Sequence, residues 1–89
     1  MPVMPRRVHS DPVARRFGAI IRRYRLQRGY TLAVAARRAG ISVSYLGFLE
    51  RGQNVPTLNV VLELAAVFAV DPGDLVREVA RRPGGGTSS

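Results

Sequence analysis

A chain of 89 residues allows one small domain, whose limited core would gain stability from tight helix packing or from oligomerisation. The sequence has no cysteine and one histidine, which excludes disulfides, thiol chemistry and the usual zinc-binding spacings. Its formal net charge of +8 is lopsided: residues 1–38 carry ten arginines and one acidic residue, whereas residues 39–89 carry four arginines and five acidic residues. This asymmetry favours a polyanionic partner, with an ordinary solvated charged surface as the alternative.

Neither an enzyme nor a membrane protein is expected. The acidic residues are spread without a paired site, the only histidine, His9, is interpreted as a surface residue, and no Gly-rich phosphate loop or nucleophile motif occurs. The longest apolar run, residues 64–70, is too short to cross a bilayer, and no secretion signal follows the paired arginines near the N-terminus. The sequence therefore predicts a cytoplasmic protein without a metal, a cofactor or membrane contact.

The N-terminal residues and the first helix differ in composition. Residues 1–10 contain two prolines and two adjacent arginines and are interpreted as a flexible basic arm. A first helix is predicted to begin with Ser10 or Asp11 as its N-cap and to run to about Arg28, where Gly29 ends it. Apolar residues recur in this helix at helical spacing, so its buried side is predicted to comprise Phe17, Ile20, Ile21 and Tyr24.

Residues 29–52 predict two short helices separated by a tight turn. Thr31 is a good N-cap for the first of them, and Gly40 can adopt the left-handed conformation that ends a helix. Ser42 then caps the next helix, over residues 43–51. A glycine at the turn, with an alanine four residues before it and a serine two residues after it, favours a helix-turn-helix motif over an ordinary helical hairpin.

The helix over residues 43–51 has two distinguishable sides. Leu46 and Leu49 lie about 60° apart on the helical wheel and are predicted to face the core. The opposite, outward side is then predicted to carry Ser44, Gly47 and Phe48, flanked by Val43 and Tyr45. Any partner of this helix would meet those outward side chains.

Two further helices are predicted after a loop at residues 52–56. Thr57 caps a fourth helix that runs to about Ala69, and Asp71 caps a fifth that reaches about Arg82. The core side of the fourth helix is predicted to comprise Leu58, Val61, Leu62, Ala65 and Phe68. In the fifth helix a dimer interface, with simple core packing as the alternative, is assigned to Leu75, Val76 and Val79.

Residues 17–75 resemble the Cro and phage-repressor-like (Xre-type) helix-turn-helix DNA-binding domains. The resemblance rests on the order and spacing of the helices and on the segments FGAIIRRYRLQRGYT, AARRAGIS, SYLGFLERG, Pro56-Thr57-Leu58 and LELAAVFAV. It implies an all-α fold, a compact five-helix lambda-repressor-like domain whose helix-turn-helix is formed by helices two and three. We place this domain at residues 11–82 and interpret residues 83–89 as a flexible tail.

The resemblance also implies a transcriptional regulator that binds a pseudo-palindromic operator in double-stranded DNA as a homodimer, with the helix over residues 43–51 in the major groove. Base contacts are therefore expected from Val43, Ser44, Gly47 and Phe48, and a base or phosphate contact from Tyr45. Val43 and Phe48 stand where the family commonly has polar residues, so thymine methyl contacts and DNA shape are expected to carry part of the specificity. The alternatives are that Phe48 packs on protein and that Tyr45 is half-buried.

Phosphate contacts are expected from arginine side chains, from the start of the second helix and from the loop at residues 52–55. Leu32 stands where the family usually has a phosphate-binding glutamine, so that contact is given up here. The residues assigned to phosphate are Arg22, Arg23, Arg28, Thr31, Arg37, Arg38, Gln53 and Asn54, with simple solvation as the alternative for several of the arginines. The resemblance further implies an ion pair between Arg25 and Glu50, in which Arg25 can also share a phosphate.

The alternative function is a protein-interaction module, antitoxin-like or an anti-activator, that uses the same helices to bind a protein partner. The apolar side chains of Val43 and Phe48 and the apolar start of the second helix favour this alternative. The arginine-rich first part of the chain opposes it, because it favours a polyanion.

Overall fold

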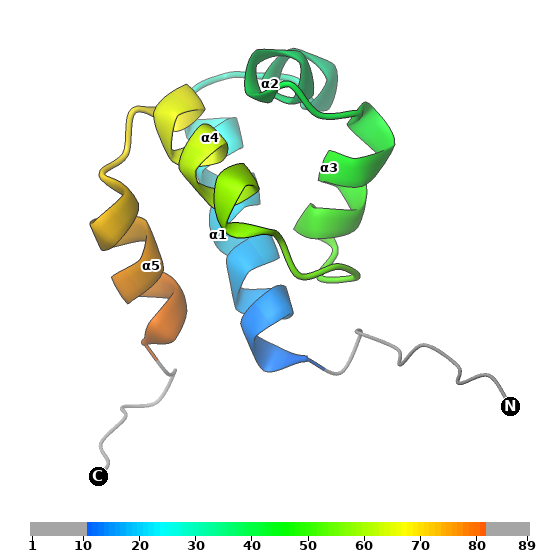
Figure 1. Ribbon diagram of the computed structural model, residues 1–89. Helices are drawn as coiled ribbons and strands as arrows, with labels where there is room; N and C mark the ends of the chain where they lie inside the picture. The colour runs from blue at the N-terminus through cyan, green and yellow to red at the C-terminus, as the bar shows by residue number, and fades with distance from the viewer. Residues whose placement is uncertain (1–10, 82–89) are drawn as a thin grey trace, which may run out of the picture.

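The computed structural model describes residues 11–81. Within that range the chain forms five α-helices and no strand (Figure 1). The helices are α1 (Pro12–Gln27), α2 (Leu32–Ala39), α3 (Val43–Glu50), α4 (Leu58–Phe68) and α5 (Pro72–Ala80). The predicted all-α, five-helix fold is confirmed. The predicted arm (residues 1–10, with His9) and tail (residues 83–89) lie outside the described residues, so the domain boundaries stay predictions.

Every helix begins at a side chain that caps it, which explains why the helix starts could be predicted. The oxygen of each cap accepts a hydrogen bond from a backbone N–H two or three residues further on, and so satisfies a donor that the first helical turn leaves free. The caps are Asp11, Thr31, Ser42, Thr57 and Asp71. The helix starts predicted from sequence are confirmed, while α5 ends at Ala80, two residues before the predicted end.

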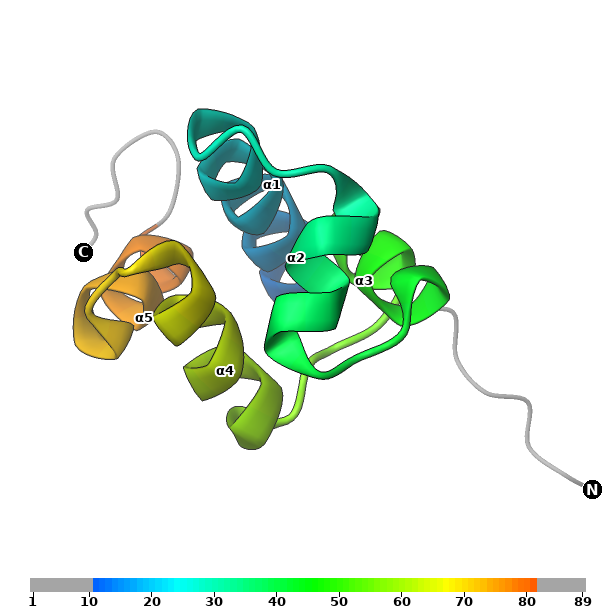
Figure 2. The same cartoon turned by 90° about the horizontal axis from the view of Figure 1, so that it is seen from above.

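The core lies around α1, which runs between the α2–α3 pair and α5 (Figures 1 and 2). The predicted buried side of α1 is confirmed, with Tyr24 at its edge and half-buried. Each large apolar side chain removed from water contributes about 1.5–3 kcal/mol to folding. The largest fully buried side chains are Ile21, Leu46, Leu49, Leu64, Phe68 and Leu75.

The buried side of α4 differs from the prediction. Ala65 and Phe68 are buried as expected, but Leu58 is 69% exposed and Leu62 is 46% exposed, while Leu64 is fully buried. The prediction that Leu58 and Leu62 belong to the core is wrong. Because α4 is apolar on nearly every side, its sequence allows more than one stripe at helical spacing, and the neighbouring helices decide which one is buried.

The apolar residues of α5 differ in their exposure to solvent. Leu75 is 1% exposed and Val79 is 9% exposed, so these two side chains pack in the domain core, which was the alternative to the dimer interface assigned to them. They lie one turn apart on the side of α5 that faces α1 and α4. Val76, which is 50% exposed, is the most accessible of the three to a partner.

Polar contacts also hold α5 against α1. Arg16 Nε donates to the carbonyl oxygen of Val79 at 2.7 Å, and the Tyr24 hydroxyl donates to Glu78 Oε1 at 2.8 Å. Arg23 Nη2 forms an ion pair with Glu78 Oε2 at 2.5 Å. The hydrogen bond from Arg23, supported by the one from Tyr24, holds the pKa of the Glu78 carboxyl below its usual range.

The lowered pKa of Glu78 predicts acid sensitivity. Its contribution to the free energy of unfolding is fully present above the ordinary glutamate pKa and is lost as the pH falls through the lower, folded-state pKa. The loss should be at most about 1 kcal/mol, because solvent screens a pair in which Arg23 is 47% exposed. Thermal unfolding should be measured at several pH values between neutral and acidic. As the pH falls, the melting temperature of Glu78→Gln should decrease less steeply than that of the wild type. The exposed Glu63 on α4 provides the control, since Glu63→Gln should show the same decrease of melting temperature with pH as the wild type.

Candidate nucleic-acid interface

The turn between α2 and α3 consists of Gly40, Ile41 and Ser42, and the two helices form a bend of 108° across it. Gly40 adopts a left-handed conformation with φ of 75°. The N–H of Gly40 donates to Arg37 O at 3.2 Å and the N–H of Ile41 donates to Ala36 O at 3.0 Å, the hydrogen-bond pattern of a glycine-terminated helix. The angle and the short turn are those of a helix-turn-helix motif.

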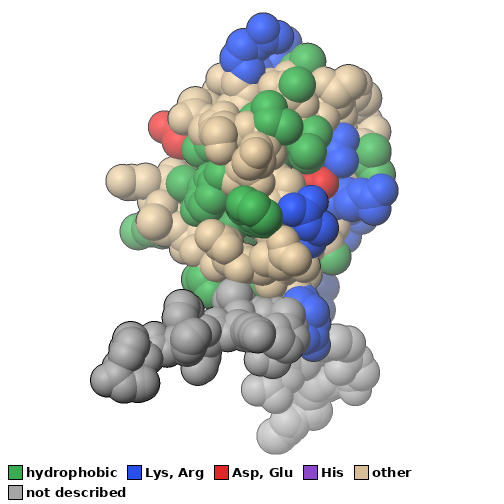
Figure 3. All heavy atoms as spheres, turned by 90° about the vertical axis from the view of Figure 1, so that its right-hand side faces the viewer, with side chains coloured by type: hydrophobic (Ala, Val, Ile, Leu, Met, Phe, Trp, Pro, Cys, Tyr) green, Lys and Arg blue, Asp and Glu red, His purple; other side chains and the backbone are tan. Residues whose placement is uncertain are grey.

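The two sides of α3 are divided largely as predicted. Leu46 and Leu49 are fully buried against α1 and α2, whereas Val43 is 45% exposed and Phe48 is 42% exposed. Ser44 is exposed as well. Figure 3 shows that hydrophobic side chains gather at the centre of this face of the molecule, with arginine side chains beside and above them. Burial of the two leucines therefore turns a mixed apolar and basic surface toward solvent.

Two of the residues assigned to this surface lie deeper than predicted. Tyr45 is half-buried and packs against the core cluster, which was the alternative for this residue. Gly47 is buried: a Cβ atom placed on it would lie 3.2 Å from Arg51 Nη1 and 3.7 Å from Leu32 Cδ2. The prediction that Gly47 belongs to the outward side is therefore wrong, because it lies on the flank of α3 that faces the start of α2.

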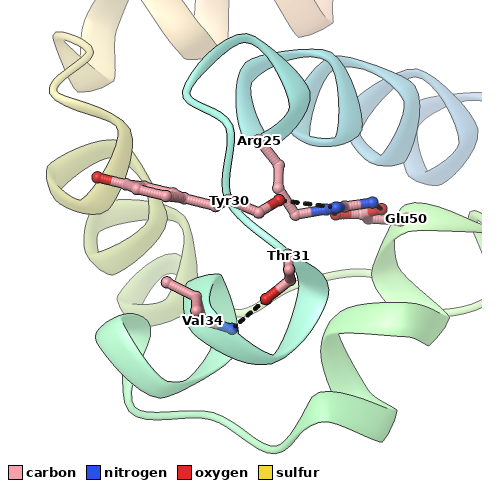
Figure 4. Close-up of polar contacts among 5 residues, drawn as sticks. All are labelled: Arg25, Tyr30, Thr31, Val34 and Glu50. Carbon is pink, nitrogen blue, oxygen red and sulfur yellow. Dashed lines mark hydrogen bonds and ion pairs between the residues drawn. The ribbon is translucent and has the colours of Figure 1, made fainter.

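The predicted ion pair between Arg25 and Glu50 is present and joins α1 to α3 (Figure 4). Arg25 Nε donates to Glu50 Oε2 at 2.7 Å and Nη2 donates to Oε1 at 3.0 Å, while Nη1 donates to Tyr30 O at 3.0 Å. The two side chains are 12% and 6% exposed. The hydrogen bond to Glu50 raises the pKa of the Arg25 guanidinium. This one arginine thus fixes the end of α3 relative to the segment that leads into α2.

Two of the arginines assigned to phosphate make contacts inside the protein. Arg23 pairs with Glu78 on α5, and Arg28 Nε donates to the carbonyl oxygen of Phe68 at 2.9 Å, with Nη2 contacting the same oxygen. These contacts hold α1 against α5 and the end of α4. Both guanidinium groups are thus engaged within the domain, although both residues are exposed, and their assignment to phosphate stays a prediction.

The other residues assigned to phosphate are exposed and accessible. The Arg38 guanidinium lies 4.9 Å from the centroid of the Tyr30 ring, and neither Arg22 nor Arg37 has an acceptor among residues 11–81. Thr31 Oγ1 accepts a hydrogen bond from the N–H of Val34 at 3.1 Å and so caps α2 (Figure 4). The remaining two, in the loop after α3, are Gln53 and Asn54.

Arg51, at the end of α3, was not among the predicted site residues. Its guanidinium lies 5.2 Å from the centroid of the Phe48 ring, and its Nε donates to Gln53 Oε1 at 3.2 Å. The spacing of three residues between Phe48 and Arg51 is the signal that could have revealed it, because side chains three apart meet on a helix surface.

A family model described as a helix-turn-helix domain matches residues 16–79, a range that contains α2, α3 and α4 entirely. The chain belongs to this helix-turn-helix family. It is 37% identical over 59 residues to the HTH-type transcriptional regulator YazB of Bacillus subtilis, with 66% of this chain and 86% of YazB covered. It is 36% identical over 62 residues to the HTH-type transcriptional regulator SinR of Bacillus licheniformis. That match covers 68% of this chain but only 56% of SinR.

Solved structures show the same fold. The restriction-modification controller protein C.AhdI from Aeromonas hydrophila superposes with a TM-score of 0.67 and 32% identity, over 70% of this chain and 94% of C.AhdI. The clp gene regulator ClgR from Corynebacterium glutamicum superposes with a TM-score of 0.72 and 26% identity, over 76% of this chain and 72% of ClgR. The Xre-like, helix-turn-helix character predicted from the sequence is confirmed, and the relatives are transcriptional regulators rather than enzymes.

No group of three or more His, Cys, Asp or Glu side chains that could hold a metal ion occurs in the part of the chain that the structure describes. Within residues 11–81 no single helix is long and apolar enough to span a membrane, and only α2 and α3 taken together, as a bent pair, reach the necessary length and apolar composition.

Proposed function

We propose that this protein is a cytoplasmic transcriptional regulator that binds specific double-stranded DNA sequences by inserting α3 into the major groove. The observation that carries this proposal is the division of α3, in which Leu46 and Leu49 are fully buried while Val43, Ser44 and Phe48 face solvent. The major groove of B-form DNA is about 12 Å wide and admits one α-helix. The helix-turn-helix motif presents its second helix in that way.

The exposed side chains can make two kinds of contact with DNA, to base edges and to phosphates. Ser44 can donate or accept a hydrogen bond at a base edge, and Val43 and Phe48 can contact thymine methyl groups. The exposed guanidinium groups of Arg22, Arg37 and Arg38, together with Asn54, are available to phosphate oxygens, which position a protein on the duplex without reading its sequence. The Arg25–Glu50 pair keeps the only carboxylate of α3 from repelling the DNA, because its charge is neutralised by a guanidinium.

We further propose that two copies bind one pseudo-palindromic operator. An apolar groove of about 210 Å³ is bounded by the start of α1, by α5 and by the loop that precedes α4. Its rim includes the exposed side chains of Val13, Val55 and Val76. None of the residues that line it belongs to α2 or α3. A second copy of the chain seated there would cover these side chains and leave both α3 helices free for DNA.

Selection of bound duplexes from a random pool tests the DNA-binding proposal. The expected result is a palindromic sequence with half-sites about one helical turn apart. Affinity should fall steeply as salt rises, and the selected site should bind roughly a thousandfold more tightly than random DNA. Ser44→Ala should alter the selected sequence, whereas Arg37→Ala should weaken all duplexes alike. A pool that shows no enrichment would contradict the proposal and favour a protein partner, whose contacts Val43 and Phe48 could supply.

Sedimentation of the free protein tests the dimer. Val76→Asp should shift the protein toward the monomer, because it places a charge in an apolar contact. The matched control is Leu26→Asp, which introduces the same charge at a 55% exposed leucine of α1 that does not line the groove. An equal response of the two variants would argue against the groove as the interface.

A further inference from the structure

Arg51 is held in place on the outer face of the helix-turn-helix, although it contributes nothing to the core. Its guanidinium lies 5.2 Å from the centroid of the Phe48 ring, a distance at which the ring attracts a cation. Its Nε donates to Gln53 Oε1 at 3.2 Å. An exposed arginine otherwise samples many rotamers, so these two contacts reduce the entropy that Arg51 would lose when it binds a ligand.

The absence of a side chain at Gly47 creates the space that this guanidinium occupies. A Cβ atom at Gly47 would lie 3.2 Å from Nη1 and 3.8 Å from Nη2 of Arg51. It would also lie 3.7 Å from Cδ2 of Leu32, the first residue of α2. Gly47 has no positive φ, so close approach rather than backbone conformation favours glycine here. The Arg51 guanidinium therefore lies along the flank of α3 that faces the start of α2.

We infer that Arg51 binds a DNA backbone phosphate, and that Phe48, Gln53 and Gly47 position it to do so; this inference rests on the proposed function. In a helix-turn-helix complex the N-terminal residues of the second helix contact base edges, while the first helix crosses the sugar-phosphate backbone. Arg51 follows the last residue of α3 and lies toward α2, which is the backbone side. Its Nη1 and Nη2 groups donate to no acceptor among residues 11–81 and form a planar pair of donors that matches two phosphate oxygens.

This placement gives the Phe48 ring a second role. The ring supports Arg51 through one face, and only its remaining surface is available to bases. If Phe48 acts by positioning Arg51 for phosphate, its replacement lowers the affinity for every DNA sequence by the same factor. If Phe48 contacts bases, the loss of affinity differs between sequences. The two roles are therefore separable by experiment.

The test compares wild type, Arg51→Ala and Arg77→Ala on a random-sequence duplex and on the duplex obtained by selection, over a series of salt concentrations. Arg51→Ala should weaken binding to both duplexes by the same factor, roughly tenfold, and should make the slope of log affinity against log salt shallower by about 0.9. Arg77→Ala removes the same charge from α5, which lies on the other side of α1 from α3 (Figures 1 and 2), and should leave the slope unchanged.

A double-mutant cycle on the random-sequence duplex tests the support by Phe48. Phe48→Leu keeps an apolar side chain but removes the aromatic face, so it should weaken the wild type several-fold and change nothing in the Arg51→Ala background. Equal losses in both backgrounds would overturn the positioning role.

Three other results would overturn the inference. If Arg51→Ala weakens only the selected duplex, Arg51 reads bases. If the wild type binds DNA and Arg51→Ala binds with the same affinity and salt slope, this inference fails while the proposed function stands. If the wild type binds neither duplex, the proposed function fails as well.

Discussion

Replacement of Gly18 by alanine should destabilise the protein by about 3 kcal/mol, although alanine is the better helix former by about 1 kcal/mol. Gly18 lies directly against the backbone of α3. A Cβ atom at this position would lie 2.2 Å from the carbonyl oxygen of Leu49 and 2.7 Å from that of Glu50. Both atoms belong to the backbone of α3, so the clash can be relieved only by moving one helix away from the other.

Thermal unfolding measures this effect directly. A loss of 1 kcal/mol lowers the melting temperature of a domain of this size by about 4–8 °C, so Gly18→Ala should lower it by more than 10 °C. The control is Ala19→Gly at the next, exposed position, which reports helix propensity alone and should cost about 1 kcal/mol. A Gly18→Ala protein that melts at or above the wild-type temperature would show that α1 and α3 are not in close contact.

Removal of the Glu50 carboxylate should cost about 3–5 kcal/mol, because it leaves the guanidinium of Arg25 largely buried without its counter-charge. The two side chains are only 12% and 6% exposed, so water can replace the lost partner only in part. Glu50→Ala also releases the end of α3 from the segment that leads into α2. Denaturant titration should show a lower free energy of unfolding, and DNA affinity should fall with it.

A second ion pair of the same chain provides the comparison. Arg77 and Asp74 on α5 form an ion pair at 2.6 Å, but their side chains are 71% and 66% exposed. Asp74→Asn should therefore change the free energy of unfolding by less than about 0.5 kcal/mol. Replacement of both Arg25 and Glu50 by apolar residues of similar volume should restore much of the stability lost in Glu50→Ala. Glu50→Ala with wild-type stability would show that the pair contributes nothing to folding.

The sequence by itself determined the features that depend on neighbouring residues in the chain. A cap such as Thr31 or Ser42 binds a backbone N–H two or three residues away, and Gly40 ends α2 through its own φ angle, so both effects are local. The inward side of α3 was predictable as well, because Leu46 and Leu49 are two leucines at helical spacing in that helix. The Arg25–Glu50 pair, separated by 25 residues, was predictable only through the family resemblance.

The tertiary structure decided which of several equivalent residues meet a neighbour. In α4 the sequence allows Leu58 and Leu62 in the core as readily as Leu64, and in α1 nothing local shows that Gly18 must touch the backbone of α3. Arginines that look alike in the sequence are divided in the same way: Arg28 serves the end of α4, whereas Arg51 is presented to solvent across Gly47. These outcomes depend on distances between helices, which the sequence pattern of a single helix does not contain.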